Sequence, residues 1–431
     1  MKKLFYKQKP FSSPEPAVEN ATFSEYPHGG NRFPRRKKLT RKHAFGGIFF
    51  AGSLSLAYAT ASMFIGPIPP EPSSVDAALP MNLKFQVVSD ADIPLVPPPV
   101  IHVKTPDAVK AAYMSSCVAS TPDFRDRVIN IVNTTEINSL VVDIKDYSGR
   151  LSYTPSNKSL LQEPDPDSCR IRNIRELIDR LHSDNIYVIG RVAVFQDPYF
   201  VGLHPDLAIR KVSTGGIWKD RKGLSWIDAA SQEMWEYTVA IARDAYSQGF
   251  DEMNFDYVRF PSDGEVSDML LPISATTTKS EVILNFFSYL SDEMKTSGIT
   301  TSADLFGMTT TANDDMNIGQ LLETALPYFD YIAPMVYPSH YPNGFNGWSN
   351  PNAHPYELIK FVMDSGSEKA IKASTTPLKL RPWLQDFSLG TPSYGKAEVE
   401  EQIRATYDAG LTSWMLWDPS NKYAGGALLR E

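Results

Sequence analysis

Several common signatures of ligand binding are missing from this 431-residue sequence. It contains neither the GxGxxG pattern of dinucleotide-binding folds nor the GxxxxGK[ST] loop that cradles a triphosphate. Its seven histidines include no HExxH pair, which argues against a catalytic zinc site, and no GxSxG elbow presents a serine nucleophile. The sequence therefore predicts no metal ion and no cofactor, and it argues against nucleotide-dependent and serine-esterase chemistry.

Charge is unevenly distributed along the chain. The 42 Lys and Arg and the 50 Asp and Glu residues give a net charge of −8, yet residues 1–43 are strongly basic and the remainder is acidic. An acidic main body argues against nucleic acid as its partner. With 42% hydrophobic and 11% aromatic residues, the chain can bury a large core, so one barrel-sized domain with additional segments is expected.

An uncharged segment follows the basic one. Residues 44–65 contain no charged side chain, and about 20 apolar residues are enough to span a bilayer. Because Lys and Arg on the N-terminal side keep that side in the cytoplasm, we predict a single-pass signal-anchor with the main domain outside the cytoplasmic membrane. Small residues at 57–61 would also serve as a signal-peptidase site, and cleavage there would make the domain secreted.

Proline is frequent in the next segment. Ten prolines lie between Gly66 and Pro106, which favours an extended, semi-rigid linker. The predicted organisation is therefore a disordered basic cytoplasmic arm at 1–43, a transmembrane helix at 44–65, a proline-rich linker at 66–106 and one folded domain at 107–431.

From residue 107 onward, strand patterns alternate with helix patterns. One predicted helix begins at Thr121 and Pro122, an N-cap followed by proline in the first turn. Eight strands alternating with helices predict a (β/α)8 TIM barrel, and an open doubly wound sheet is the competing arrangement. The predicted strands span 109–115, 139–146, 187–195, 252–260, 300–306, 331–337, 378–385 and 413–418.

The segment GFDEMNFDYVRFP at 249–261 departs from the pattern of a fully buried strand. Apolar side chains alternate with Asn254 and Asp256, so one face is apolar and the other carries an amide and a carboxylate. A carboxylate near the C-terminal end of a barrel strand lies where ligands bind in this fold. Asp256 is therefore the first candidate for a functional residue.

Polar and aromatic residues recur at the same end of the other predicted strands. Such a set suits carbohydrate, because sugar hydroxyls bind charged and amide groups and the apolar faces of sugars pack on aromatic rings. Cleavage of a glycosidic bond needs one carboxyl group to protonate the leaving oxygen and another to attack or stabilise the sugar carbon. Asp256 and Asp304, on neighbouring strands, are the predicted catalytic pair. The predicted substrate-binding residues are Asp143, Lys145, Arg191, Asn254, Arg259, Tyr337, Trp383, Trp417 and Asp418.

Four segments resemble one known family. They are VVDIKDYSG at 141–149, GFDEMNFDYVRFP at 249–261, YIAPMVYPSHY at 331–341 and LRPWLQDF at 380–387. They are similar to a glycoside hydrolase domain family of largely uncharacterised bacterial proteins. That family is a TIM-barrel group distantly similar to the α-amylase-like and chitinase-like hydrolases. The resemblance covers residues 110–418 and implies hydrolase activity.

The resemblance supports the fold more strongly than the mechanism. In the α-amylase-like enzymes the fourth strand ends with an Asp nucleophile two residues after an Arg, and the fifth strand supplies a Glu acid. Here Asn254 stands at the Arg position, and Asp304 would stand where the Glu is expected.

The sequence thus predicts a glycoside hydrolase-like enzyme acting on a polysaccharide at the cell surface. Two other classes stay open: a carbohydrate-binding barrel without turnover and a cell-envelope scaffold that docks a protein. Asp256 has a structural alternative as an ion-pair partner of Arg191 or Arg259. The structural alternative for Asp143 and Lys145 is an ion pair with each other. The sugar, the linkage, the stereochemical course and the oligomeric state are not determined by the sequence.

The only two cysteines lie in loops at the same end of the predicted barrel. Cys117 follows the first strand and Cys169 follows the second. Outside the cytoplasm, cysteines in neighbouring loops favour a disulfide, and two buried thiols are the alternative.

Overall fold

The computed structural model describes residues 99–165 and 168–430. The predicted arm and transmembrane segment, and the predicted linker up to residue 98, lie outside these residues. None of the helices described is both long enough and apolar enough to cross a bilayer. The membrane anchor at 44–65 therefore stays a prediction.

Eight parallel strands form a closed barrel in the order β1-β10-β9-β8-β7-β5-β3-β2. Each strand falls within a range predicted from the sequence, so the (β/α)8 barrel is confirmed and the open sheet is excluded. The pairing of β1 with β10 closes the barrel. The strands are β1 Lys110–Met114, β2 Ser139–Lys145, β3 Tyr187–Ala193, β5 Glu252–Asp256, β7 Thr300–Phe306, β8 Tyr331–Met335, β9 Trp383–Gln385 and β10 Trp414–Trp417.

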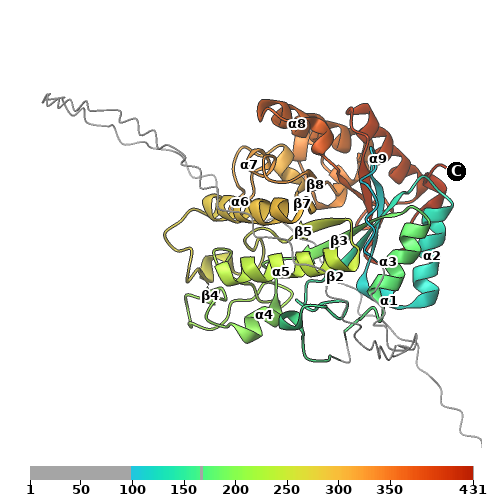
Figure 1. The fold of residues 1–431 in the computed structure, drawn as a ribbon. Coiled ribbons are helices and arrows are strands. Elements are labelled where there is room, and N and C mark those ends of the chain that lie inside the picture. The colour runs from blue at the N-terminus through green and yellow to red at the C-terminus, as the bar shows by residue number, and fades with distance from the viewer. Residues whose placement is uncertain (1–98, 166–167, 431) are drawn as a thin grey trace, which may run out of the picture. The chain divides into compact units, whose positions relative to one another are not determined.

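Helices lie outside the strands (Figure 1). Capping residues bound the helix at Gln232–Gln248, α5: the hydroxyl of Ser231 accepts a hydrogen bond from the backbone N–H of Met234 at its start, and Gly249 ends it with φ 115°. The helices are α1 Ser116–Ser120, α2 Pro122–Asn133, α3 Ile174–Ser183, α4 Pro198–Leu203, α5 Gln232–Gln248, α6 Lys279–Ser297, α7 Leu322–Ala325, α8 Pro355–Lys372 and α9 Lys396–Asp408.

One predicted helix is shorter than expected. The sequence at 318–328 has a helical pattern, but α7 covers only four residues. Gly319, inside that stretch, adopts φ 85°, which a right-handed helix does not allow. A short antiparallel pair, β4 (Arg210–Lys211) and β6 (Met269–Leu270), lies outside the barrel sheet.

Buried apolar residues form two layers. The larger one packs between the strands and the surrounding helices. A smaller cluster fills the barrel interior, because alternate residues of each strand point inward. It includes Ala111, Val141, Ile189, Trp383 and Met415.

The N-terminal end of the barrel is closed by an ion pair and by the chain that precedes β1. Arg381 donates two hydrogen bonds from Nη1 to Glu252, at 2.8 and 3.1 Å, and both side chains are buried. The backbone N–H of Val103 donates to Asp251 at 2.7 Å. Packing against the barrel thus extends to residues within the predicted linker. This end of the barrel is therefore filled by side chains.

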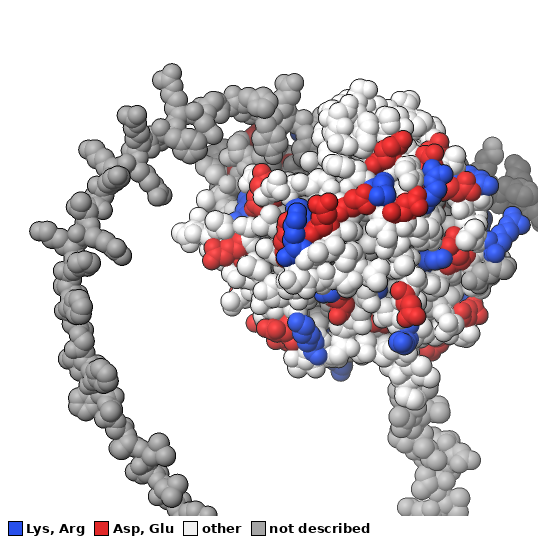
Figure 2. All heavy atoms as spheres, turned by 90° about the horizontal axis from the view of Figure 1, so that it is seen from above, with Lys and Arg blue, Asp and Glu red and all other residues white. Residues whose placement is uncertain are grey.

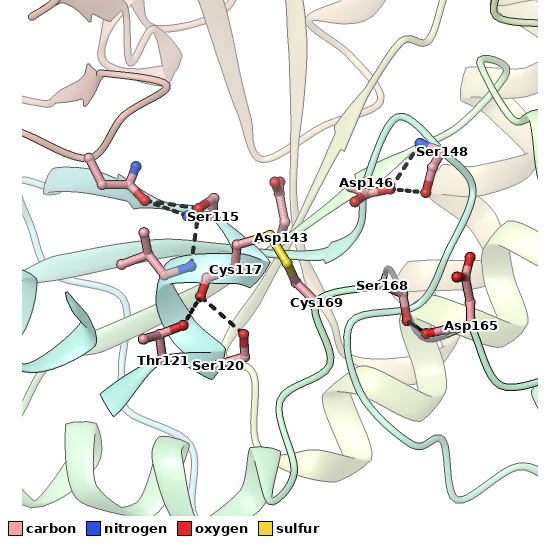
Figure 3. Close-up of a disulfide and its surroundings, with 12 residues drawn as sticks. Ser115, Cys117, Ser120, Thr121, Asp143, Asp146, Ser148, Asp165, Ser168 and Cys169 are labelled. Carbon is pink, nitrogen blue, oxygen red and sulfur yellow. Dashed lines mark hydrogen bonds between the residues drawn. A yellow bond between two sulfur atoms is a disulfide. The ribbon is translucent and has the colours of Figure 1, made fainter. Parts of the chain in front are cut away.

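The predicted disulfide is present. Cys117, in α1, and Cys169, in the loop before α3, are bonded with their Cα atoms 4.7 Å apart (Figure 3). The carbonyl oxygen of Cys117 also accepts hydrogen bonds from the hydroxyls of Ser120 and Thr121, so the half of the bond in α1 is well ordered. The disulfide ties together the loops that follow β1 and β2.

Replacing both cysteines with serine is expected to lower the free energy of unfolding by about 2–4 kcal/mol. The bond connects positions 52 residues apart, so its loss increases the conformational entropy of the unfolded chain. Urea unfolding of the full chain, with wild type in reductant as the control, measures the loss. The disulfide would be contradicted if both cysteines of the denatured wild-type chain were alkylated without reductant. Mass spectrometry would show this as an increase in mass.

Candidate active site

A cluster of charged side chains lies inside the barrel near the C-terminal ends of β2, β3, β5 and β7. At its centre is Arg191. The guanidinium donates from Nη1 to Asp143 at 2.6 Å and from Nη2 to Asp256, and its Nε lies 3.6 Å from Oδ2 of Asp304. All four side chains are at most 7% exposed. The structure thus brings four of the predicted site residues together.

Strand register accounts for this convergence. Asp143 pairs with Arg191 across β2 and β3, and Arg191 pairs with Asn254 across β3 and β5. Because side chains alternate at a period of two, these residues face the interior at one level. Asp256 and Asp304 lie two residues further along their strands, nearer the C-terminal mouth.

Asp256 is the last residue of β5. Its Oδ1 accepts the backbone N–H of Tyr257 at 2.5 Å, and its Oδ2 accepts from Arg191. Both oxygens act as acceptors, which is the role of an ionised carboxylate. Tyr257 has φ 54°, a left-handed conformation that few residues other than glycine adopt. Backbone strain of this kind is concentrated at functional sites, and here it ends the strand directly after the carboxylate.

Asp304 has a different environment. Its Oδ1 accepts hydrogen bonds from Nδ2 of Asn254 at 2.9 Å and from Nε1 of Trp383 at 2.8 Å, and its side chain is 1% exposed. The pKa of Asp304 is raised to about 8, mainly by burial and in addition by the negative charge of Asp256, while Arg191 and the hydrogen bonds from Asn254 and Trp383 lower it. Asp304 is therefore mainly protonated at neutral pH, with Oδ2 available to carry the proton.

Asp143 is held by a second donor in addition to Arg191. The hydroxyl of Tyr113 donates to its Oδ2 at 2.5 Å. Burial raises the pKa of Asp143, and the contacts with Arg191 and Tyr113 lower it. Tyr113 was not predicted as a site residue. The sequence did contain a signal for it, because Tyr113 has the same parity along β1 as the inward-facing Ala111.

Aromatic rings line the wall beside this cluster. Trp417 stacks on Tyr113 with ring centroids 4.0 Å apart, lies 5.0 Å from the Arg191 guanidinium and meets Trp383 edge-on at 5.4 Å. Trp417 is partly exposed, whereas Trp383 is buried. Of the two predicted tryptophans, Trp417 is therefore the one with surface available to a ligand.

Tyr337, two residues after the end of β8, belongs to the same buried cluster as Tyr113 and Trp383. Burial raises the pKa of its hydroxyl, and the negative charges of Asp304 and Asp256 raise it further, so the phenol keeps its proton. The rings of His340 and Phe387 pack against Tyr337 at 5.3 and 5.5 Å. The structure places Tyr337 beside the predicted catalytic pair.

Lys145 is a predicted site residue that the structure places away from the charged cluster. It is fully buried and pairs with Asp197, Nζ to Oδ2, at 2.6 Å. The strand register shifts between Asp143 and Lys145, so the two residues do not form the mutual ion pair considered from the sequence. The Lys145–Asp197 pair connects β2 to the start of α4.

Two more predicted residues have local partners of their own. The Arg259 guanidinium lies between the rings of Trp226 and Phe306, at 4.9 and 4.6 Å, and the cation that Asp256 contacts is Arg191. Asp418 accepts the backbone N–H and the hydroxyl of Ser420, at 2.6 and 2.7 Å, and so shapes the turn after β10.

Asp386 is a further acid at this end of the barrel that sequence reasoning missed. It follows β9 directly in the segment LRPWLQDF, and its Oδ2 accepts the backbone N–H of Ala424 at 2.9 Å. Burial raises the pKa of Asp386 to about 7, and the charge of Asp418 contributes. Its position one residue beyond the strand was the signal available in the sequence.

The closed parallel barrel places this protein in the TIM-barrel class. Its carboxyl groups lie at the C-terminal ends of the strands, where TIM-barrel enzymes have their active sites. Residues 111–423 match the family described as "putative glycosyl hydrolase domain", and the chain belongs to that family.

Solved structures include several similar proteins. A hypothetical protein from Ruminiclostridium thermocellum is 31% identical over 45% of this chain and 96% of its own, with a TM-score of 0.39. The PgaB glycoside hydrolase domain from Bordetella bronchiseptica is 11% identical over 73% of this chain and 95% of its own, with a TM-score of 0.51, which shows a shared fold. Alpha-L-fucosidase isoenzyme 2 from Paenibacillus thiaminolyticus is 11% identical over 74% and 48%, with a TM-score of 0.49. No curated protein matches the chain.

Proposed function

We propose that this domain hydrolyses glycosidic bonds with Asp256 and Asp304 as its catalytic carboxyl pair. The observation that carries the proposal is the contrast between these two groups. They come from neighbouring strands and contact one guanidinium, yet Asp256 accepts from two donors while burial raises the pKa of Asp304. Two carboxyl groups in different environments serve as the acid and the nucleophile or base of many glycosidases.

Each carboxyl group has a role in this proposal. Protonated Asp304 donates its proton to the leaving glycosidic oxygen, and ionised Asp256 either attacks the sugar carbon or activates a water molecule. A separation of about 5–5.5 Å between the carboxyl groups favours the first course and about 6.5–9.5 Å the second. Arg191 holds Asp256 in place and balances the charge of the site.

The remaining residues of the mouth would bind the sugar. Trp417 offers an apolar face for a sugar ring, and the hydroxyl of Tyr337 lies beside the pair to donate to substrate. Asp143 and Asn254 support the site through Arg191 and Asp304. Lys145, Arg259 and Asp418 have local partners and would act on substrate only through the elements they position.

A carbohydrate-binding barrel without turnover is the second candidate. The observation that favours it is the position of Arg191, a permanent cation that contacts Asp143 and Asp256 and lies near Asp304. In that case the carboxylates would balance Arg191 and shape the mouth. The two functions differ in whether new reducing ends form.

The location of the domain is part of the proposal. We propose that residues 44–65 anchor the chain and that the barrel lies outside the cytoplasmic membrane, acting on a polysaccharide of the cell surface. The disulfide between Cys117 and Cys169 supports this location, because such bonds persist in oxidising compartments.

A screen of the full chain against cell-wall and capsular glycans tests the proposal, with new reducing ends as the readout. A hydrolase releases reducing ends from at least one glycan. Binding without release by the wild-type chain would contradict hydrolysis and favour the binding function.

The pH dependence of hydrolysis is expected to follow the Asp304 proton. Because the pKa of this carboxyl is raised to about 8, the general acid stays protonated through neutral pH and is lost as the pH rises through about 8. The pH profile of kcat/KM should therefore fall on its alkaline side near that value. A profile that stays flat from pH 6 to about 10 would exclude Asp304 as the acid.

A further inference from the structure

We propose that the mouth accepts an anionic glycan, whose carboxylate, sulfate or phosphate groups bind a basic turn at residues 219–222. This inference depends on the proposed function for the position of the reacting bond. The basic turn, with sequence KDRK, lies in the excursion between α4 and α5. Its contacts fix its shape, its position and its charge.

The basic turn is shaped by its one acid. Asp220 is 8% exposed, and its carboxylate accepts the backbone N–H groups of Lys222 and Leu224, at 3.0 and 2.9 Å, and Nε1–H of Trp226 at 3.0 Å. The Asp220 carboxylate is therefore used to fold the turn. The three cations that flank it, Lys219, Arg221 and Lys222, are exposed.

One side of the basic turn is joined to the end of β5. The Trp226 ring, which is bonded to Asp220, meets the Tyr257 ring edge-on at 5.8 Å. Tyr257 directly follows Asp256 and supplies the backbone N–H that Asp256 accepts. Trp226 and Tyr257 therefore connect the basic turn to Asp256, the predicted nucleophile or base.

The positive charge of the basic turn also acts on His340, in the loop after β8. The His340 ring packs against Tyr337 with ring centroids 5.3 Å apart. The pKa of His340 is lowered to about 4, mainly by desolvation and in addition by the positive charge of Lys222. His340 is therefore neutral at physiological pH, and the positive charge here comes from Lys222.

The cations of the basic turn have no acidic partner in the fold. Within residues 99–165 and 168–430, Lys219, Arg221 and Lys222 form no ion pair. Elsewhere both signs occur together: acidic and basic side chains are interspersed on the face shown in Figure 2, and Lys360 pairs with Asp364 along α8. The basic turn thus gathers three cations without an ion pair within four consecutive residues of a chain whose net charge is −8.

An anionic glycan would satisfy these cations. Lys and Arg donate charge-assisted hydrogen bonds to carboxylates, sulfates and phosphates, whereas a neutral sugar offers only hydroxyls. Arg191 does not serve this purpose, because its guanidinium is already occupied by the carboxylates inside the barrel. The basic turn would bind the charged group of a sugar unit at the rim while an adjoining unit reaches Asp256 and Asp304.

Matched pairs of polymers test the inference in the full-length protein. The probes are a polyuronate with its carboxyl-reduced neutral form, and dextran sulfate with dextran. We expect wild type to bind at least one charged polymer about tenfold or more tightly than its neutral match. The difference should shrink at about 1 M ionic strength, where charges are screened within about 3 Å.

Charge-reversal variants connect the effect to the basic turn. Lys222→Glu, and Arg221→Glu independently, should each reduce binding of the charged polymer about tenfold and leave the neutral polymer unaffected. The matched control is Lys104→Glu, because Lys104 is exposed beside Val103 at the opposite, N-terminal end of the barrel. Circular dichroism confirms that each variant is folded.

The outcomes separate this inference from the proposed hydrolysis. Charge-dependent binding that is lost in Lys222→Glu, without release of reducing ends from any polymer, supports the inference and contradicts the hydrolase. Hydrolysis of neutral and charged polymers at equal rates, by wild type and Lys222→Glu alike, overturns the inference and leaves the hydrolase intact. Equal or absent binding of charged and neutral polymers also overturns it.

Discussion

Asp256→Asn and Asp304→Asn are each expected to reduce glycan hydrolysis by about 10²–10⁴-fold or more while glycan binding is retained. Asn has nearly the shape of Asp but can neither attack a sugar carbon as a carboxylate nor donate an acidic proton. Initial rates of reducing-end release measure the loss, and calorimetric titration measures binding. The matched control is Asp364→Asn, an exposed acid of α8 paired with Lys360, which should leave hydrolysis unchanged.

Stability separates a catalytic loss from a folding defect in these variants. The folded protein raises the pKa of Asp304 to about 8, whereas a carboxyl group in an unfolded chain titrates near 3.9. The stability associated with the Asp304 proton is fully present below pH ~4 and is lost as the pH rises through about 8. Asn does not ionise, so Asp304→Asn should become increasingly stable relative to wild type as the pH rises from 5 to 9.

Two results would contradict this assignment. Hydrolysis by both Asn variants at the wild-type rate would place the reaction on other groups, such as Asp143, which contacts the same guanidinium, or Asp386 and Asp418. A wild-type chain that binds glycan but releases no reducing ends would show that the carboxyl pair serves binding alone.

Arg191→Met is expected to lower the free energy of unfolding by about 3–5 kcal/mol. The substitution keeps an unbranched side chain but removes the cation that contacts Asp143 and Asp256 and lies near Asp304. Removal of one partner from a buried charge cluster leaves the other charges uncompensated, and this cost exceeds the value of the original pair. Urea unfolding at pH 5 and pH 8 measures the change.

The stability lost in Arg191→Met is expected to increase with pH. Arg191 lowers the pKa of both Asp143 and Asp304, so its loss raises these values further. Ionisation of carboxyl groups with raised pKa destabilises the folded state, so the defect should be largest at pH 8 and smaller at pH 5.

Charge-neutralising substitutions and a second arginine provide the controls. Adding Asp143→Asn and Asp256→Asn to Arg191→Met should restore part of the lost stability, because fewer buried charges lack a partner. Arg259→Met is the matched control: Arg259 is similarly buried, but it packs between aromatic rings and forms no ion pair with the residues described. Equal, pH-independent losses in Arg191→Met and Arg259→Met would show that the charge cluster does not act as a unit.

The barrel was predictable because strand and helix signals agreed along the whole domain. Each strand had an apolar pattern of the right length, and Thr121 and Pro122 marked the start of α2. The helical pattern failed at 318–328, where Gly319 adopts a positive φ and only Leu322–Ala325 are helical. Hydrophobic periodicity does not report the backbone conformation of a single residue.

The candidate site was only partly predictable. Period-two alternation placed Asp143, Arg191 and Asp256 on the inner face of their strands, so their convergence followed from the fold. The ion-pair partner of each charged residue could not be predicted from this alternation. Lys145 has the same parity as Asp143, yet a shift in register directs it to Asp197 in a different loop.

The sequence by itself determined the eight-stranded barrel, the two cysteines able to form a disulfide and the carboxylates at the strand ends, because these depend on local patterns and on connectivity. Only the tertiary structure decided that Arg191 is the common partner of Asp143 and Asp256, that burial raises the pKa of Asp304 to about 8, and that Trp226 joins the basic turn at 219–222 to Tyr257 at the end of β5. These features depend on which side chains meet across distant strands and on how much water burial removes. Both are set by closure of the barrel and by the loops packed over its end.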